Sequence, residues 1–285
     1  MLRGLLLIFA CIGVLQPLAK GGDLSRAEDL FRRTDYTASL ALLDKASVDP
    51  ATNFLVGRDY LMSGEFKKAI QYLERAAAGD PANSDYEDWL GRAYGKCAET
   101  SNMIAAPGWA SKARRAFEKA VQLNPKNSDA LDDLFDYYLN APGFMGGGYD
   151  KAERVASMIA AIDPAEGLYD KSKLAEKRKE YSAAEEHLRQ AVAIAPHSIG
   201  HMIQLAKLLA KEGRIQESDA VFEQAGRLAP NSPQLLFAQA DVLIKQKRDL
   251  NEARALLEKY LQLPITADDP PREEAFRLLK EAGGV

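Results

Sequence analysis

The sequence predicts an all-α protein built as an α-solenoid of about seven helix pairs with one further helix at its C-terminal end. The first observation is a set of prolines at similar intervals: Pro50, Pro81, Pro125, Pro164, Pro196, Pro230 and Pro264. The last three intervals, from Pro164 onward, are 32, 34 and 34 residues. A fixed period near 34 residues indicates stacked repeats.

The second observation is the pattern that precedes each proline. In the segment that ends at Pro81, the apolar positions are Ala69, Leu73 and Ala76. Steps of four and three residues place them on one face of an α-helix, and the small residues let a neighbouring helix approach closely. Proline then ends the helix, because it lacks an amide proton and restricts the residue before it.

A further helix precedes each of these segments and is joined to it by a short turn. In one unit this first helix carries Gly57 and Tyr60, and Ser63 and Gly64 form the turn. Each unit is therefore an antiparallel helix pair. One pair cannot bury its apolar face alone, whereas stacked pairs can.

These residues resemble the tetratricopeptide repeat family, whose pattern places Trp, Leu, Gly and Tyr in the first helix and Ala, a large apolar residue, Ala and Pro in the second. The third unit matches this pattern at Leu90, Gly91, Tyr94, Ala113, Phe117, Ala120 and Pro125. The resemblance implies a right-handed solenoid. Its expected repeats are 23–50, 51–83, 84–127, 128–164, 165–196, 197–230 and 231–264.

The two ends of the chain have their own signals. Residues 1–21 join one arginine, a short apolar run and small residues, which predicts a secretory signal peptide and a protein that is exported, periplasmic or secreted. An uncleaved anchor is the alternative. Residues 270–282 predict a helix that covers the last repeat, with Asp269 as N-cap and prolines in its first turn.

Composition limits the classes of partner. Loss of residues 1–21 removes Arg3 and Lys20 and changes the formal charge from −4 to −6, which argues against nucleic acid. Cys97 is then the one cysteine left, so we expect no internal disulfide. No second long apolar run is present, so we expect no stable membrane span after the signal is removed.

Two intervals are stretched, from Pro81 to Pro125 and from Pro125 to Pro164. We expect the extra residues to enlarge the turns inside the third and fourth pairs, which carry Trp109, Phe144 and Met145. Enlarged turns on one edge of a solenoid often bind a partner. In the alternative, these side chains fold back over longer first helices.

The first helix of the fourth repeat is strongly acidic. The resemblance implies a concave surface lined by Asp129, Asp132 and Asp136, beside Asp85, Asp88 and Arg92 of the third repeat. Such a surface suits a protein or peptide with basic segments. In the alternative, the carboxylates form a solvated face near a helix N-terminus.

We expect no enzyme, cofactor or metal site. His197 and His201 have the spacing of metal ligands, but a third ligand is lacking nearby, so we interpret them as surface residues. The predicted function is an exported, non-catalytic scaffold that binds a protein or peptide through the groove and the turns of repeats 3 and 4. The alternative is a small-ligand or transporter accessory protein with an apolar channel, a partner of a substrate-binding protein.

Overall fold

A computed structural model describes residues 21–266 and 269–283, and within those ranges it contains helices and no strand. The α-helices are α1 (Gly21–Arg32), α2 (Tyr36–Leu42), α3 (Pro50–Met62), α4 (Phe66–Gly79), α5 (Ser84–Thr100), α6 (Ala106–Leu123), α7 (Ser128–Asn140), α8 (Tyr149–Ala160), α9 (Pro164–Lys177), α10 (Tyr181–Ile194), α11 (Ile199–Lys211), α12 (Ile215–Leu228), α13 (Pro233–Lys245), α14 (Leu250–Gln262) and α15 (Arg272–Gly283). The short 3₁₀ helix η1 (Gly143–Met145) lies between α7 and α8. The predicted α-solenoid of helix pairs is confirmed.

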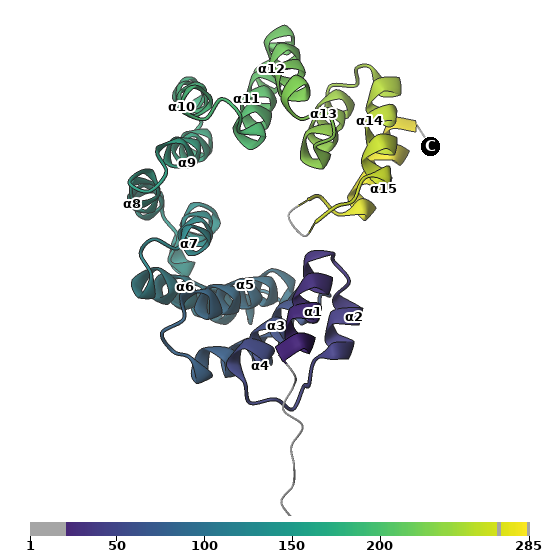
Figure 1. Ribbon diagram of the computed structural model, residues 1–285. Helices are drawn as coiled ribbons and strands as arrows, with labels where there is room; N and C mark the ends of the chain where they lie inside the picture. The colour runs from purple at the N-terminus through teal and green to yellow at the C-terminus, as the bar shows by residue number, and fades with distance from the viewer. Residues whose placement is uncertain (1–20, 267–268, 284–285) are drawn as a thin grey trace, which may run out of the picture.

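The pairs follow one another around a ring (Figure 1). The first helix of each pair, from α3 through α13, faces the centre of this ring, and the second helix lies outside it. Consecutive first helices also contact each other, as α5 does α7 and α7 does α9. Residues from successive repeats therefore meet on the inner surface.

The helix starts explain the role of the prolines. Pro50 and Pro164 do not end a repeat as expected but occupy the first turn of α3 and α9, behind the caps Asp49 and Asp163. Proline suits that position, because its missing amide proton has no partner there in any helix. The first and fourth repeats therefore end one residue earlier than predicted.

Glycine lets the two helices of a pair approach closely. A Cβ atom on Gly91 of α5 would lie 2.6 Å from two ring carbons of Phe117 on α6. Gly57 of α3 has the same relationship to Leu73 of α4. In both repeats, the glycine of the first helix therefore packs directly against the large apolar residue of the second helix.

The extra residues of the third repeat lengthen its helices, and the prediction of an enlarged loop there is wrong. Helices α5 and α6 have 17 and 18 residues, against 13 and 14 in α3 and α4. The turn between them is only 101–105. Trp109 accordingly lies within α6, stacked on Tyr94 of α5 with ring centroids 5.9 Å apart.

The extra residues of the fourth repeat do form an enlarged turn. Its glycines are required by the backbone: Gly146 has a φ of 95°, and a Cβ on Gly147 would lie 1.8 Å from the carbonyl oxygen of Ala141. The Gly148 amide donates to the Tyr138 carbonyl oxygen at 2.8 Å. Tyr137 donates its hydroxyl proton to the carbonyl oxygen of Met145 at 2.7 Å and holds η1 in place.

The C-terminal helix covers the last pair as predicted, with its start corrected by two residues. Helix α15 begins at Arg272, so both prolines precede it. Asp269 accepts hydrogen bonds from Thr266 rather than from the first turn of the helix. Ala275, Leu278 and Ala282 pack into the cluster around α14. The predicted signal peptide lies outside the described residues, apart from Gly21.

Candidate partner-binding surface

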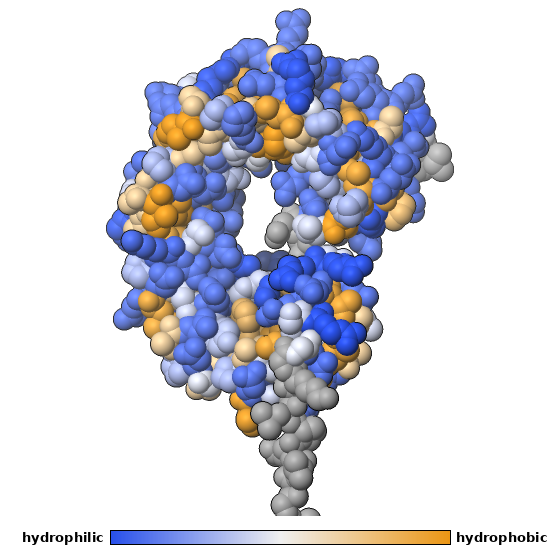
Figure 2. Space-filling view, in the orientation of Figure 1, coloured by the Kyte–Doolittle hydropathy of each residue, from blue (hydrophilic) through white to orange (hydrophobic). Residues whose placement is uncertain are grey.

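The inner surface of α5, α7 and α9 carries a dense group of charged residues, which we call the acidic surface. Its members are Asp85, Asp88, Arg92, Asp129, Asp132, Asp133, Asp136, Glu166, Asp170 and Lys173. Eight of the ten are carboxylic acids. Figure 2 shows that the ring encloses an open centre, bordered in this view mainly by hydrophilic residues.

Arg92 joins α5 to α7 through its guanidinium group. It forms a charged hydrogen bond with Asp133 and lies 3.0 Å from Asp88 and 4.0 Å from Asp129. Asp88 is only 1% exposed. Asp88 and Arg92, both predicted to contact a partner, are therefore used within the protein.

Burial changes the ionisation of this pair of acids. Burial and, second to it, the neighbouring Asp133 carboxylate raise the pKa of Asp88 to about 8, although Arg92 opposes the rise. Burial also raises the pKa of Asp133. The two carboxyl groups therefore hold a proton near neutral pH, which limits the cost of burying them together.

Lys173 joins α7 to α9 through ion pairs, as Arg92 joins α5 to α7. Its Nζ atom lies 2.5 Å from Oδ1 of Asp136 and 3.4 Å from Oδ1 of Asp170. The ammonium group also lies over the rings of Phe135 and Tyr169. Asp136 is thus neutralised by a basic residue of the next repeat.

Asp129 and Asp132 are predicted acids that no basic residue in the described part of the chain contacts closely. The Asp129 side chain is 72% exposed and lies 4.0 Å from Arg92. Burial, followed by the nearby Glu166, raises the pKa of Asp132 to about 7. Asp85 is exposed and accepts a hydrogen bond from Asn127 at 2.7 Å. A basic group that approached Asp132 would restore its usual ionisation.

The structure also shows a row of charged residues of which the sequence analysis named only Arg92 and Asp136. Counting six residues back from one left-handed turn residue in each of five repeats gives the same position in their first helices; these turn residues are Thr34, Gly64, Lys179, Gly213 and Lys247. Repeat 3 has no such residue, and the left-handed Gly146 of repeat 4 lies in the enlarged turn, so there the match is two residues before Tyr94 and Tyr138. We call these residues the inner row: Glu28, Arg58, Arg92, Asp136, Lys173, Lys207 and Asp241. The extra residue in α9 hides this register in a count from its N-terminus.

The comparisons with known proteins agree with this architecture. Residues 175–242 match the family model described as tetratricopeptide repeat. Residues 175–242 are therefore identified as tetratricopeptide repeat sequence. No curated protein sequence matches it at a significant level.

Solved structures extend the likeness in fold to most of the length of the chain. One from Parabacteroides merdae has a TM-score of 0.63 and 15% identity over 93% of this chain and 99% of the other. A thermophilic protein of Thermus thermophilus has a TM-score of 0.55 and 20% identity over 66% and 97%. In the APC/C hetero-tetramer Cut9–Hcn1, the TM-score is 0.51 with 17% identity over 92% of this chain and 49% of the other. These identities show a shared fold.

The turn residues of the repeat protein separate into two groups. Trp109 is half-buried against the core, with Lys112 over its ring. Phe144 is 80% exposed, whereas Met145 is half-buried. Met103 and Ile104 in the turn of the third repeat are each 93% exposed and were not predicted. Folding back therefore describes Trp109, whereas Phe144 is the exposed aromatic residue of the two predicted here.

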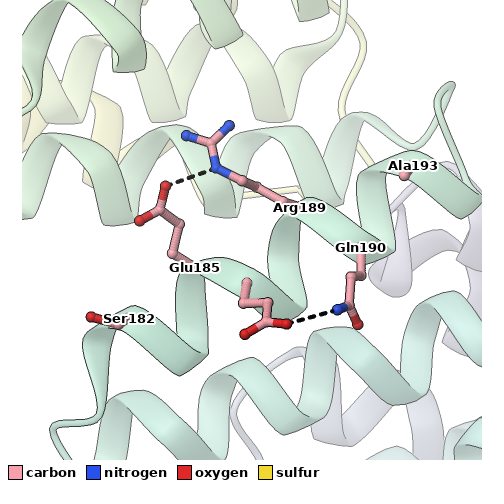
Figure 3. Close-up of a pocket in the computed structure, with 6 residues that line it drawn as sticks. Ser182, Glu185, Arg189, Gln190 and Ala193 are labelled. Atoms are coloured by element: carbon pink, nitrogen blue, oxygen red, sulfur yellow. Dashed lines mark hydrogen bonds and ion pairs between the residues drawn. The ribbon is translucent and has the colours of Figure 1, made fainter.

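Two hollows lie away from these turns. One, of about 390 Å³, lies on α10 alone, where Arg189 pairs with Glu185 and Gln190 with Glu186 (Figure 3). The other, of about 460 Å³, lies between α9, α11 and α13 and is lined by Lys207, among others. Neither lies beneath the stretched turns.

His201 and Cys97 are buried side chains, whereas His197 is exposed. His201 is not a surface residue as expected: it is 6% exposed, and its Nε2 lies 3.1 Å from Glu166. Cys97 is buried, and burial raises the pKa of its thiol. Among the described residues, no group of three His, Cys, Asp or Glu side chains could hold a metal ion, and no helix is long and apolar enough to cross a membrane.

Proposed function

We propose that this protein is a non-catalytic scaffold that binds a basic segment of a protein or peptide on its acidic surface. The repeat fold generally mediates protein–protein interaction, and that part follows from the family. The observation that carries the finer proposal is the excess of carboxylates on α5, α7 and α9 after the internal pairs of Arg92 and Lys173 are counted. Asp129 and Asp132 remain for a partner.

Charge complementarity is the mechanism. A lysine or arginine placed between Asp129 and Asp132 meets carboxylates fixed on one rigid helix, so little conformational entropy is lost. The positive charge also lowers the pKa of Asp132 and adds a charge-assisted hydrogen bond. The exposed Phe144, Met103 and Ile104 lie at the turns of the same repeats and supply apolar contacts at the edge.

A direct titration tests this proposal. An acetylated and amidated lysine-rich peptide should bind the unmodified protein and bind Asp129→Lys/Asp132→Lys at least tenfold more weakly in calorimetry. The matched control is Glu258→Lys/Glu273→Lys, which makes the same change of charge at exposed positions of α14 and α15. Equal weakening in both double variants would show that net charge alone decides binding and would reject the acidic surface as the site.

Export is also proposed, on the basis of the sequence of residues 1–21. Expression of the full chain in a bacterial host, followed by fractionation and mass spectrometry, checks it. We expect a product in the periplasm or medium that begins near residue 22. An intact N-terminus on a cytoplasmic product would reject export.

A further inference from the structure

Arg58 is a position in the inner row where a half-buried guanidinium group forms no ion pair, although the carboxylates of Asp59, Glu28 and Asp85 lie near enough to favour its charge. Its guanidinium carbon lies 4.0 Å from the ring centroid of Phe31, 4.4 Å from that of Trp89 and 5.1 Å from that of Phe54. Among the described arginines, Arg58 is the one that is not exposed and forms neither a hydrogen bond nor an ion pair; its Nε atom is buried without a partner. Burial lowers its pKa.

The equivalent residues in neighbouring repeats show what is missing. Arg92, one repeat later, is held by Asp88 and Asp133. Lys173, three repeats later, is held by Asp136 and Asp170. A buried charge is costly unless it is paired, and the rings around Arg58 fix its position without providing the direct ion pairs that Arg92 and Lys173 have.

Lys207 repeats this situation on the other side of the acidic surface. It is half-buried on α11, lines the hollow between α9, α11 and α13, and has no ion pair. The two other lysines of that hollow are paired, Lys211 with Glu176 and Lys245 with Asp241. The inner row thus has free cations at two places, with the acidic surface between them.

We propose that the partner of this protein carries acidic side chains on both sides of its basic segment, and that these bind Arg58 at one end and Lys207 at the other. This inference rests on the proposed function, since the basic segment occupies the acidic surface. A carboxylate suits Arg58 because the guanidinium offers parallel N–H donors. The inner surface continues past Arg58 to α1, so a bound chain passes over this residue and a side-chain carboxylate fits there.

The geometry sets the length of the probe. Arg58 lies on α3 and Lys207 on α11, four repeats apart. Adjacent packed helices are about 10 Å apart, which gives roughly 40 Å along the row. An extended chain rises about 3.3 Å per residue, so about 12 residues span the distance.

Three acetylated and amidated peptides of this length distinguish the effect of where the glutamates lie from the effect of net charge. The first has lysine at alternate positions in the middle and glutamate at both ends. The second has the same composition with both glutamates in the centre. In the third, glutamine replaces both glutamates. If only net charge mattered, the third would bind most tightly, because it is the most basic.

We expect the peptide with terminal glutamates to bind most tightly, by about fivefold for each end that forms its pair. Arg58→Met should remove the advantage of one glutamate and Lys207→Met that of the other, in calorimetry. Trp89, as the sole tryptophan of a Trp109→Phe background, should report the Arg58 end by its fluorescence. Arg58→Lys, which keeps a charge without the planar donor group, should retain a smaller advantage.

The possible outcomes distinguish failure of the proposed function from failure of the inference about Arg58 and Lys207. If the peptides bind in an Asp132-dependent manner but the end glutamates give no advantage, the inference fails and the proposed function stands. Each end is judged by its own variant, so an advantage that survives Arg58→Met rejects the pair at Arg58. If only a peptide with a free C-terminal carboxylate binds more tightly, the side-chain assignment is overturned. Binding of none of the peptides rejects both proposals.

Discussion

Lys173 on α9 donates a hydrogen bond to Asp136 on α7, with 2.5 Å between Nζ and Oδ1. This pair removes one of the acids that the sequence predicts for partner binding. We therefore expect Asp132→Asn to weaken binding of a lysine-rich peptide several-fold more than Asp136→Asn does. Calorimetric titration of the two variants measures this difference, and a larger loss in Asp136→Asn would show that the pair opens on binding.

Binding of a basic partner should depend on pH near neutrality. Burial raises the pKa of Asp132 to about 7, so this group is mostly ionised at pH 8 and mostly protonated at pH 6. Affinity for the lysine peptide should therefore fall as the pH decreases from 8 to 6. Asp132→Asn should flatten that profile, and an unchanged profile in this variant would assign the effect to other groups.

Stability should depend on pH through Asp59. This carboxyl is buried, accepts a hydrogen bond from Ser39 at 2.7 Å, and has a pKa raised by burial to about 7. The unfolded chain ionises near pH 4, so the contribution of Asp59 is full below that value and is lost as the pH rises through about 7. The effect of Asp59→Asn on the free energy of unfolding, measured against the unmodified protein, should therefore be more favourable at pH 8 than at pH 5, by on the order of 2 kcal/mol. Urea unfolding at both pH values tests this, and equal effects would contradict it.

Two glycines of one helix give a matched test of pair packing. Gly91→Ala forces a methyl group against Phe117 and should lower the free energy of unfolding by about 2 kcal/mol. Gly95→Ala, one turn later, meets nothing within 4 Å and should be neutral or slightly stabilising. Thermal unfolding followed by circular dichroism distinguishes them; similar losses would mean that helix α5 tolerates no alanine for another reason.

Replacement of Trp109 by alanine should lower stability much more than replacement of Phe144. Trp109→Ala removes a ring packed on Tyr94 and should cost about 2–3 kcal/mol of stability. Phe144→Ala should change stability by less than about 0.5 kcal/mol, because the side chain is 80% exposed. Loss of partner binding in Phe144→Ala without loss of stability would support a role for the turn, whereas unchanged binding would exclude Phe144 from the site.

The repeat pattern was sufficient to predict the helix pairs, because the pattern positions contact each other within a pair, as Gly91 and Phe117 do. The charged surface was predicted less well. The family resemblance implied the same role for Asp129, Asp132 and Asp88, but Asp88 is buried. Its burial depends on α7, which brings Asp133 and Asp129 around Arg92. The unpaired state of Arg58 also depends on other helices, because α1 and α5 supply the rings of Phe31 and Trp89.

The ion pairs of Arg92 and Lys173 have a mechanical consequence. Both cross between first helices on the inner side of the ring, so they tie successive repeats together there. Because we propose that the partner binds Asp129 and Asp132, both pairs should stay closed when it binds. The ring should then keep its curvature, and the distance between the two ends of the chain should be the same with and without a partner.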